Sequence, residues 1–312
     1  MSSTITVTGG SGFVGQLVRR GLAEEGYDLR VFDPYRGRRV DLLRRRRLIA
    51  ANSPRALRIA QRVRAGQIHA ESWLQRARVI RRHSDDILGD RDELAARFAG
   101  SHAVIHLAGI PHPHWPGDFV RMNYDASVNV FEAARAAGVP NFVFASSAQV
   151  YAINAPVRIE QFPMLESNHL PHPDEGQSLY GFLKGAFERY LRGACSTGTT
   201  QAISLRLECP GIRSSSPGNL YVSTSIENLV AAFSCALRPP DDLGFEVFNV
   251  ADAEVDPAIV DIQAYLRSRW AYVPNHTVGN QCLMGTEKAQ RLLGYRPRND
   301  GTYIDQSLVW SA

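Results

Sequence analysis

The chain has 312 residues, 44% of them hydrophobic, which is enough apolar material to bury a large core and excludes a disordered chain. Its formal net charge is +4, and no stretch reaches the roughly 18 uncharged apolar residues of a membrane span. Residues 4–8 read directly as a strand, without the pattern of a signal peptide. We therefore expect a soluble, cytoplasmic protein with no membrane partner.

Short apolar segments alternate with amphipathic segments over most of the chain, which is typical of a parallel sheet covered by helices on both faces. Strands are predicted at residues 4–8, 28–32, 78–81, 103–107, 141–145, 202–207 and 246–250, and helices at 14–25, 92–98, 119–137 and 178–192. After Leu207 the pattern breaks into Pro, Gly and Ser. We expect a main α/β domain at 1–207 and a small substrate-binding region at 208–312, with the strand at 246–250 returning to the sheet.

A glycine-rich turn, ThrGlyGlySerGlyPheValGly, follows the first predicted strand and opens the first helix. Gly9, Gly12 and Gly15 let the backbone turn sharply and approach a pyrophosphate, which then lies against the amides of the helix N-terminus. The adjoining Phe13 and Val14 belong to the same cofactor-binding segment. With the doubly wound sheet, this turn predicts a Rossmann dinucleotide-binding domain.

An acidic residue, Asp33, ends the second predicted strand about twenty residues after the glycine turn. Its carboxylate is placed to accept hydrogen bonds from the adenosine ribose of NAD, and it would repel the 2′-phosphate of NADP. Arg36, Arg38 and Arg39 lie close by in the sequence and keep NADP open as an alternative.

An arginine-rich insert spans residues 36–82, with 15 Arg against two acids, Asp41 and Glu71, or about +13. The rest of the chain then carries about −9, since 4 − 13 = −9. Three interpretations fit this insert: a solvated helical hairpin, an anion-binding lid and a subunit contact. Nucleic-acid binding is disfavoured, because the basic run has no interleaved aromatic residues and no known module.

Tyr180 and Lys184 form a YxxxK pair within the helix predicted at 178–192. Residues four apart on a helix stand on one face. A lysine cation beside a phenol favours the phenolate, so we expect the pKa of Tyr180 to fall towards neutrality and its oxygen to act as a general base. The chain has 33 Arg and only two Lys, Lys184 and Lys288. A lysine at 184 therefore indicates a specific need for a compact ammonium.

These motifs together resemble the extended short-chain dehydrogenases/reductases of the NAD-dependent epimerase/dehydratase type, from Thr4 to about Pro297. Ser84 to Leu88 resembles the acid and apolar residue that contact adenine, here Asp86 and Ile87. HisLeuAlaGly at 106–109 resembles the strand end that lines the cofactor. Further cofactor residues implied by the resemblance are Leu107, Ala108, Gly109 and Asn123.

SerSerAlaGlnValTyrAla resembles the segment that carries the family's catalytic hydroxyl, here Ser147. The resemblance implies that Tyr180 takes a proton from a substrate hydroxyl, that Lys184 binds the nicotinamide ribose, and that Ser147 orients the same substrate oxygen. It also implies a homodimer. The family's dehydratases have Asp-Glu after that hydroxyl, whereas this chain has Ala148 and Gln149, so dehydration is disfavoured.

The segment from Arg206 to Leu229 is short for this family, which suggests a small substrate and resembles uronate dehydrogenases. Arg213 is then the candidate partner of a sugar carboxylate. His112, in a loop expected to cover the substrate, and Ser147, Ala148 and Gln149 are the other candidate substrate-binding residues. A dehydrogenase, an epimerase and a non-catalytic redox-sensing module remain open. We expect no metal site, because the His residues lack ligand spacing and Cys195, Cys209, Cys235 and Cys282 lie far apart without a CxxC pair.

Overall fold

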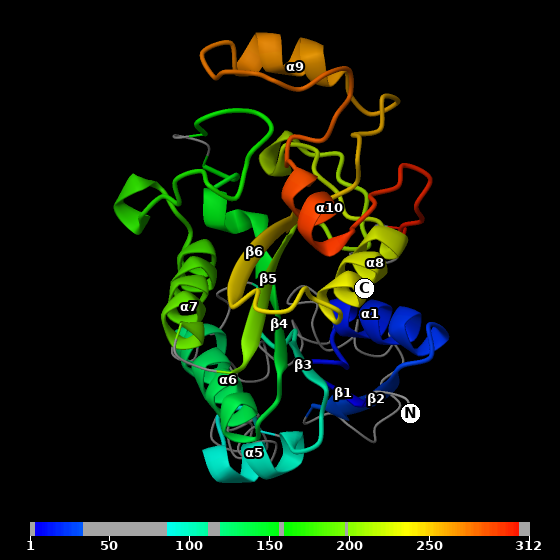
Figure 1. The fold of residues 1–312 in the computed structure, drawn as a ribbon. Helices are drawn as coiled ribbons and strands as arrows, with labels where there is room; N and C mark the ends of the chain where they lie inside the picture. Colours follow the sequence, from blue (N-terminus) through cyan, green and yellow to red (C-terminus); the bar gives the residue numbers. More distant parts are fainter. Residues whose placement is uncertain (1–3, 34–85, 112–118, 156–158, 197–198, 306–312) are drawn as a thin grey trace, which may run out of the picture.

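The computed structural model describes residues 4–33, 86–111, 119–155, 159–196 and 199–305 (Figure 1). The predicted strand at 78–81, the arginine-rich insert and His112 lie outside these ranges. Within them no helix is both long and apolar enough to cross a membrane.

The centre of the molecule is a parallel sheet of six described strands in the order β2-β1-β3-β4-β5-β6 (Figure 1). The strands are β1 (Thr4–Thr8), β2 (Asp28–Phe32), β3 (Ala103–His106), β4 (Asn141–Ser147), β5 (Gln201–Leu207) and β6 (Phe245–Val250). The chain runs outward from β1 to β2 and then crosses back to β3 on the other side of β1. This confirms the doubly wound α/β fold, and it places a topological switch point between β1 and β3, where such sheets bind ligands.

Helices cover both faces of the sheet, which is why the strands other than β2 are buried along nearly their whole length. One face packs Ile5, Val7 and Leu205 against α1 (Phe13–Glu24) and α8 (Ile226–Ala236). The other packs Phe142 and Phe144 against α5 (Arg91–Phe98), α6 (Ala126–Ala136) and α7 (Leu179–Cys195). Figure 1 shows the two groups of helices on opposite sides of the strands.

The C-terminal third divides between the sheet and a part beyond its carboxyl edge, called the cap, which contains α9 (Ile262–Arg269) and the other segments of a third core cluster. Helix α8 lies against α1 and β6 extends the sheet next to β5, whereas α9 lies apart from the sheet in Figure 1. Helix α10 (Glu287–Leu293) contacts β6. The third core cluster, which includes Tyr151, Phe162 and Trp270, holds the cap together.

The helix predicted at 119–137 contains an irregularity that its periodicity does not show. The segment Arg121–Asp125 is a π-turn, and α6 continues from it. Asn123 lies in this turn, donates from Nδ2 to the carbonyl of Phe119 at 2.9 Å, and accepts at Oδ1 from the amide of Ile110 at 3.0 Å. π-turns are frequent at functional sites, and this one ties the helix to the loop after β3.

A buried ion pair joins α7 to the sheet. Arg206 on β5 donates to Glu188 on α7 through Nε at 3.1 Å and Nη2 at 2.6 Å. Burial alone lowers the pKa of Arg206, but Glu188 and Tyr151 together outweigh it and raise that pKa above its ordinary value. Two hydroxyls, of Ser146 and Ser204, also donate to Glu188, at 2.7 Å and 3.2 Å.

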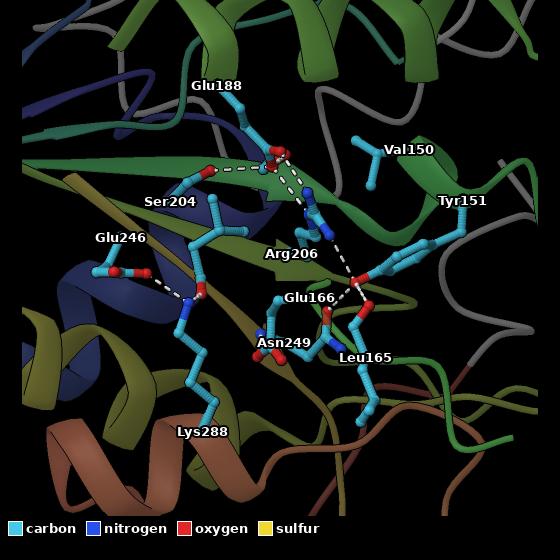
Figure 2. Close-up of polar contacts among 12 residues, drawn as sticks. Val150, Tyr151, Leu165, Glu166, Glu188, Ser204, Arg206, Glu246, Asn249 and Lys288 are labelled. Carbon is cyan, nitrogen blue, oxygen red and sulfur yellow. Dashed lines mark hydrogen bonds and ion pairs between the residues drawn. The ribbon is translucent and has the colours of Figure 1, made fainter. Parts of the chain in front are cut away.

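The same arginine connects the sheet to the cap. Arg206 Nη1 donates to the hydroxyl of Tyr151 at 2.6 Å, and that oxygen lies 2.8 Å from Asn249 Oδ1 and 3.1 Å from the carbonyl of Leu165. Figure 2 shows this run of contacts from Glu188 through Arg206 to Tyr151. One buried network therefore sets the positions of α7, the end of β4 and the cap.

Replacing Arg206 by Met should lower the free energy of unfolding by about 3–5 kcal/mol, because Glu188 would keep a buried charge without its partner. Urea unfolding followed by far-UV circular dichroism measures this. The control is Arg20→Met, in the exposed pair with Glu24 at 3.1 Å, which should change stability by less than about 1 kcal/mol. Equal losses in the two variants would contradict the structural role given to the buried pair.

Candidate active site

The glycine turn is packed so closely that side chains are excluded from it. Gly9 has φ +71°, and a Cβ there would lie 2.5 Å from the amide nitrogen of Ala108. A Cβ on Gly15 would lie 2.3 Å from the carbonyl oxygen of Gly9. Gly12 is the N-cap of α1 and provides no side-chain cap, and the segment continues into the helix through Phe13 and Val14. The turn thus leaves backbone amides at the start of α1, as a bound pyrophosphate requires.

Asp33 lies directly after β2 and beside this turn. Its Oδ2 accepts from the amide of Ser11 at 3.0 Å, and the side chain is buried. A carboxylate is therefore held at the end of β2, next to the glycine turn, where an adenosine ribose lies in a dinucleotide site. Arg36, Arg38 and Arg39 lie outside the described residues, so the choice between NAD and NADP stays as the sequence left it.

The predicted adenine-contacting pair has local contacts of its own. Asp86 Oδ1 accepts from the amide of Leu88 at 3.0 Å, and Ile87 is buried against the sheet. Asn129 on α6 holds this turn by donating from Nδ2 to the carbonyls of Ile87 and Gly89, each at 3.0 Å. The two residues thus lie in an ordered turn between the insert and α5.

The loop after β3 brings the predicted cofactor residues together. The amide of Leu107 donates to the carbonyl of Thr8 at 3.0 Å, and Ala108 contacts Gly9. A Cβ built on Gly109 would lie 3.0 Å from Asn123 Oδ1 and 3.8 Å from Lys184 Nζ. Because the glycine turn, this loop, Asn123 and Lys184 are neighbours, residues from four segments of the chain meet at the switch point of the sheet.

Lys184 is a buried cation at the centre of this site. Its Nζ donates to the carbonyl of Ala145 on β4 at 2.8 Å and lies 4.4 Å from the ring centre of Phe144 and 5.5 Å from that of Tyr180. Burial lowers the pKa of Lys184 to about 7, although the Glu188 carboxylate acts in the opposite direction. The ammonium is thus placed between the strand end and the phenol ring.

Ser147 and Tyr180 approach the lysine from β4 and α7. Ser147 is the last residue of β4, and its Oγ accepts from the amide of Gln149 at 3.1 Å, capping the short helix η3 (Ala148–Tyr151). Gly181 allows α7 to lie against η3, because a Cβ there would lie 2.2 Å from the carbonyl oxygen of Gln149. The half-buried Tyr180 therefore stands beside the turn that Ser147 caps.

The expected lowering of the pKa of Tyr180 is wrong for this structure. Burial raises that pKa well above 10, and the Glu208 carboxylate raises it further. An uncharged phenol is favoured where the side chain is partly withdrawn from water and an anion is near.

Sequence reasoning missed two buried polar groups of the site. His106 lies 2.7 Å from Thr8 Oγ1 and 2.9 Å from Ser127 Oγ, and burial, reinforced by Lys184, lowers its pKa to about 3, so the ring is neutral. Glu208 follows β5 directly, and burial raises its pKa to about 7. The sequence did contain a signal for Glu208, because it is an ionisable residue directly after a predicted buried strand.

The predicted substrate residues are only partly brought together. Gln149 donates from Nε2 to Glu208 Oε2 at 3.4 Å, while Ala148 is buried in the third core cluster. Arg213 instead forms an ion pair with Asp256 and lies 4.4 Å from the ring centre of Tyr303. Among the described residues no group of three His, Cys, Asp or Glu side chains is arranged to hold a metal ion.

Residues 5–210 match the model of the NAD dependent epimerase/dehydratase family. The chain belongs to this family. Its fold is shared with a short-chain dehydrogenase/reductase superfamily protein from Agrobacterium tumefaciens with bound NAD (TM-score 0.61, 21% identity, 99% of this chain and 95% of that one) and with a mutated uronate dehydrogenase (TM-score 0.58, 18% identity, 100% and 85%). This agrees with the family and the structural resemblance expected from the motifs.

One curated relative matches this chain over a shorter stretch of sequence. The NAD-dependent glucose-6-phosphate dehydrogenase of Haloferax volcanii is 41% identical over 109 residues, which are 31% of this chain and 40% of that enzyme. The chain covers less than two thirds of the length of the curated relatives it matches. The comparisons therefore establish an NAD-dependent family of sugar epimerases and dehydrogenases.

Replacing Gly15 by Ala should weaken NADH binding by at least about tenfold, because the new Cβ would push apart the turn that approaches the pyrophosphate. Titration of NADH fluorescence measures the affinity. The control is Gly193→Ala on the same type of element, a helix, where nothing lies within 4 Å of the new Cβ. That variant should bind NADH normally and be stabilised by up to about 1 kcal/mol. Normal binding by Gly15→Ala would contradict the assignment of the turn.

Proposed function

We propose that this protein uses NAD to oxidise a hydroxyl carbon of a sugar, sugar acid or sugar nucleotide, acting as a dehydrogenase or as an epimerase. The observation that carries the proposal is the position of Lys184. Its Nζ lies 5.5 Å from the Tyr180 ring centre and 3.8 Å from the Cβ position of Gly109, in the loop that contacts the glycine turn. One cation therefore lies close both to the phenol that would accept the proton and to the loop that contacts the dinucleotide-binding turn.

The residues divide into those that hold the coenzyme and those that act on the substrate. The turn from Gly9 to Gly15 would bind the pyrophosphate, Asp33 the adenosine ribose, and Lys184 the nicotinamide ribose. NAD, when bound, supplies the hydride acceptor. Ser147 and Tyr180 are then left to orient the substrate hydroxyl and to take its proton.

Tyr180 needs its cationic neighbour, because burial and Glu208 hold the proton on its phenol. Glu188, one turn further along α7, raises the pKa of Lys184 against the effect of burial and so favours the ammonium. The protonated lysine in turn favours the phenolate. The chain's own residues therefore provide a base whose strength depends on a cation held in place by a buried carboxylate.

The choice of enzyme over a redox sensor follows from the same residues. A module that only senses the coenzyme has no use for a tyrosine and a serine next to a buried lysine. Ala148 and Gln149 lack the carboxyl groups that water elimination uses, so oxidation without dehydration is the reaction we favour. A homodimer and NADP use remain predictions of the sequence.

Tyr180→Phe should lower turnover by about 10² to 10⁴ while NADH affinity changes little, because the variant loses only the hydroxyl that accepts the proton. Turnover is measured by the absorbance of reduced nicotinamide over a panel of free sugars, uronates and sugar nucleotides. The control is Tyr272→Phe, on an exposed side chain, which should keep full activity. Full turnover by Tyr180→Phe would exclude the phenol as the base.

The same panel separates the alternatives for the wild-type protein. Net reduction of NAD marks a dehydrogenase, and product formed without net reduction marks an epimerase. If neither occurs on any substrate although NADH binds, the redox-sensing alternative stands and the enzymatic proposal fails.

Lys184→Met should shift the pH dependence of oxidation. In the wild type, we expect kcat/KM to rise with pH as the Tyr180–Lys184 pair loses its first proton, because the remaining proton can stay on Lys184 and leave the phenolate. In Lys184→Met the phenol must ionise alone, so this limb should move to higher pH by about 1–3 units. The control is Lys288→Met, on α10, whose Nζ donates to the carbonyl of Val247 at 2.9 Å. That variant should keep the wild-type profile. An unmoved limb in Lys184→Met would contradict the coupling between the lysine and the phenol.

A further inference from the structure

Glu208 places a carboxyl group at the carboxyl edge of the sheet, beside the proposed catalytic residues. It is the first residue after β5, whose last residue, Leu207, is paired in register with Ser147 at the end of β4. The side chain is 7% exposed. It therefore lies at the level where the substrate must approach Ser147.

The contacts of Glu208 connect it to the N-terminus of α7. Gln149, which donates to Oε2 at 3.4 Å, also has its carbonyl oxygen against Gly181, the residue next to Tyr180. The Glu208 carboxylate is the neighbouring charge that acts on the phenol of Tyr180. The carboxyl group and the phenol therefore belong to the same small region of the protein.

The partners of this carboxyl group are all uncharged. Oε1 accepts from Asn219 Nδ2 at 3.2 Å and from the thiol of Cys209 at 3.6 Å. Oε2 has only the long contact with Gln149 among the described residues, although a carboxylate oxygen can accept two hydrogen bonds. Burial and these hydrogen bonds from Asn219, Cys209 and Gln149 are the influences on the pKa of Glu208, and none of these three residues carries a positive charge.

We propose that Glu208 contacts the substrate and determines its charge: Oε2 accepts a hydrogen bond from a sugar hydroxyl, and the carboxylate disfavours sugars that carry an anionic group on the ring. This rests on the proposed function, because it assumes that a sugar is presented to Tyr180. A site built to pair with a hydroxyl discriminates strongly against a substrate that cannot donate one.

Repulsion by Glu208 does not depend on which ring carbon carries the anionic group. Two like charges about 8 Å apart, at an effective dielectric constant of about 20, repel enough to weaken binding by about thirtyfold. A carboxylate on any carbon of a pyranose ring would lie within such a distance of Glu208 if the ring contacts it. The sugar-acid substrate suggested by Arg213 is therefore replaced by a sugar whose ring carries no anionic group.

The test compares sugars whose ring is uncharged (the neutral members) with matched sugars that carry a ring carboxylate (the acidic members), in wild type and in Glu208→Gln, which removes the charge and keeps an oxygen acceptor. The probes are glucose with glucuronate, galactose with galacturonate, and UDP-glucose with UDP-glucuronate. Their affinities for the NADH-loaded protein are measured by ligand-observed NMR titration at pH 8.5, above the pKa of about 7 of Glu208. This titration measures binding and does not require turnover.

The wild type should bind the neutral member of at least one pair at least about tenfold more tightly than the acidic member, and Glu208→Gln should reduce that preference by at least about tenfold, mainly through tighter binding of the acidic sugar. Glu254→Gln, on an exposed side chain, should retain the wild-type preference. Matching melting temperatures and NADH affinities confirm that the Glu208 variant is folded.

An unchanged preference in Glu208→Gln, a wild type that prefers the acidic sugars, or a wild type that binds neither member of any pair would each overturn the inference. Failure of the proposed function has a different signature. The binding preference and its loss in Glu208→Gln would then be present, while no panel substrate reduces NAD or forms product.

Discussion

The arrangement of the site depends on one buried ammonium. Lys184 gives up most of its water, in exchange for the carbonyl of Ala145 and the faces of two aromatic rings, and its pKa falls to about 7 as a result. A lysine in this condition is close to losing its charge, so small changes in its surroundings decide whether it is a cation. Every role proposed for Lys184 requires the protonated ammonium. The residues around Lys184 therefore influence the proposed reaction through its pKa.

Two carboxyl groups act on this centre in different ways. Glu188 is held by Arg206 and two serine hydroxyls and favours the ammonium of Lys184 from one turn along α7. Glu208 has only uncharged partners, and burial raises its pKa to about 7. The first is a structural anion whose charge is matched inside the protein. The second leaves hydrogen-bonding capacity at the place where a substrate would lie.

The sheet explains how such distant residues come together. All described strands are parallel, so their carboxyl ends meet at one edge. Gly9 follows β1, Asp33 follows β2, Gly109 belongs to the loop after β3, Ser147 ends β4, and Glu208 follows β5. The Arg206 network then connects this edge to the cap through Tyr151, so the cap that would enclose a substrate is positioned by the same buried pair that positions α7 (Figure 2).

The sequence by itself determined the features that depend on local pattern. The apolar alternation predicted the parallel sheet, the glycine spacing identified the turn before α1, and the YxxxK spacing put Tyr180 and Lys184 on one helix face. Such features follow from neighbours a few residues apart, where backbone geometry sets the outcome.

The tertiary structure decided the features that depend on burial and on charges distant in the chain. The raised pKa of Tyr180, the neutral ring of His106, the pairing of Arg213 with Asp256 and the position of Glu208 all arise from groups brought together by folding. Desolvation and Coulomb interaction act through space, and a sequence does not display distances between residues such as Glu208 and Tyr180 that only the sheet brings close.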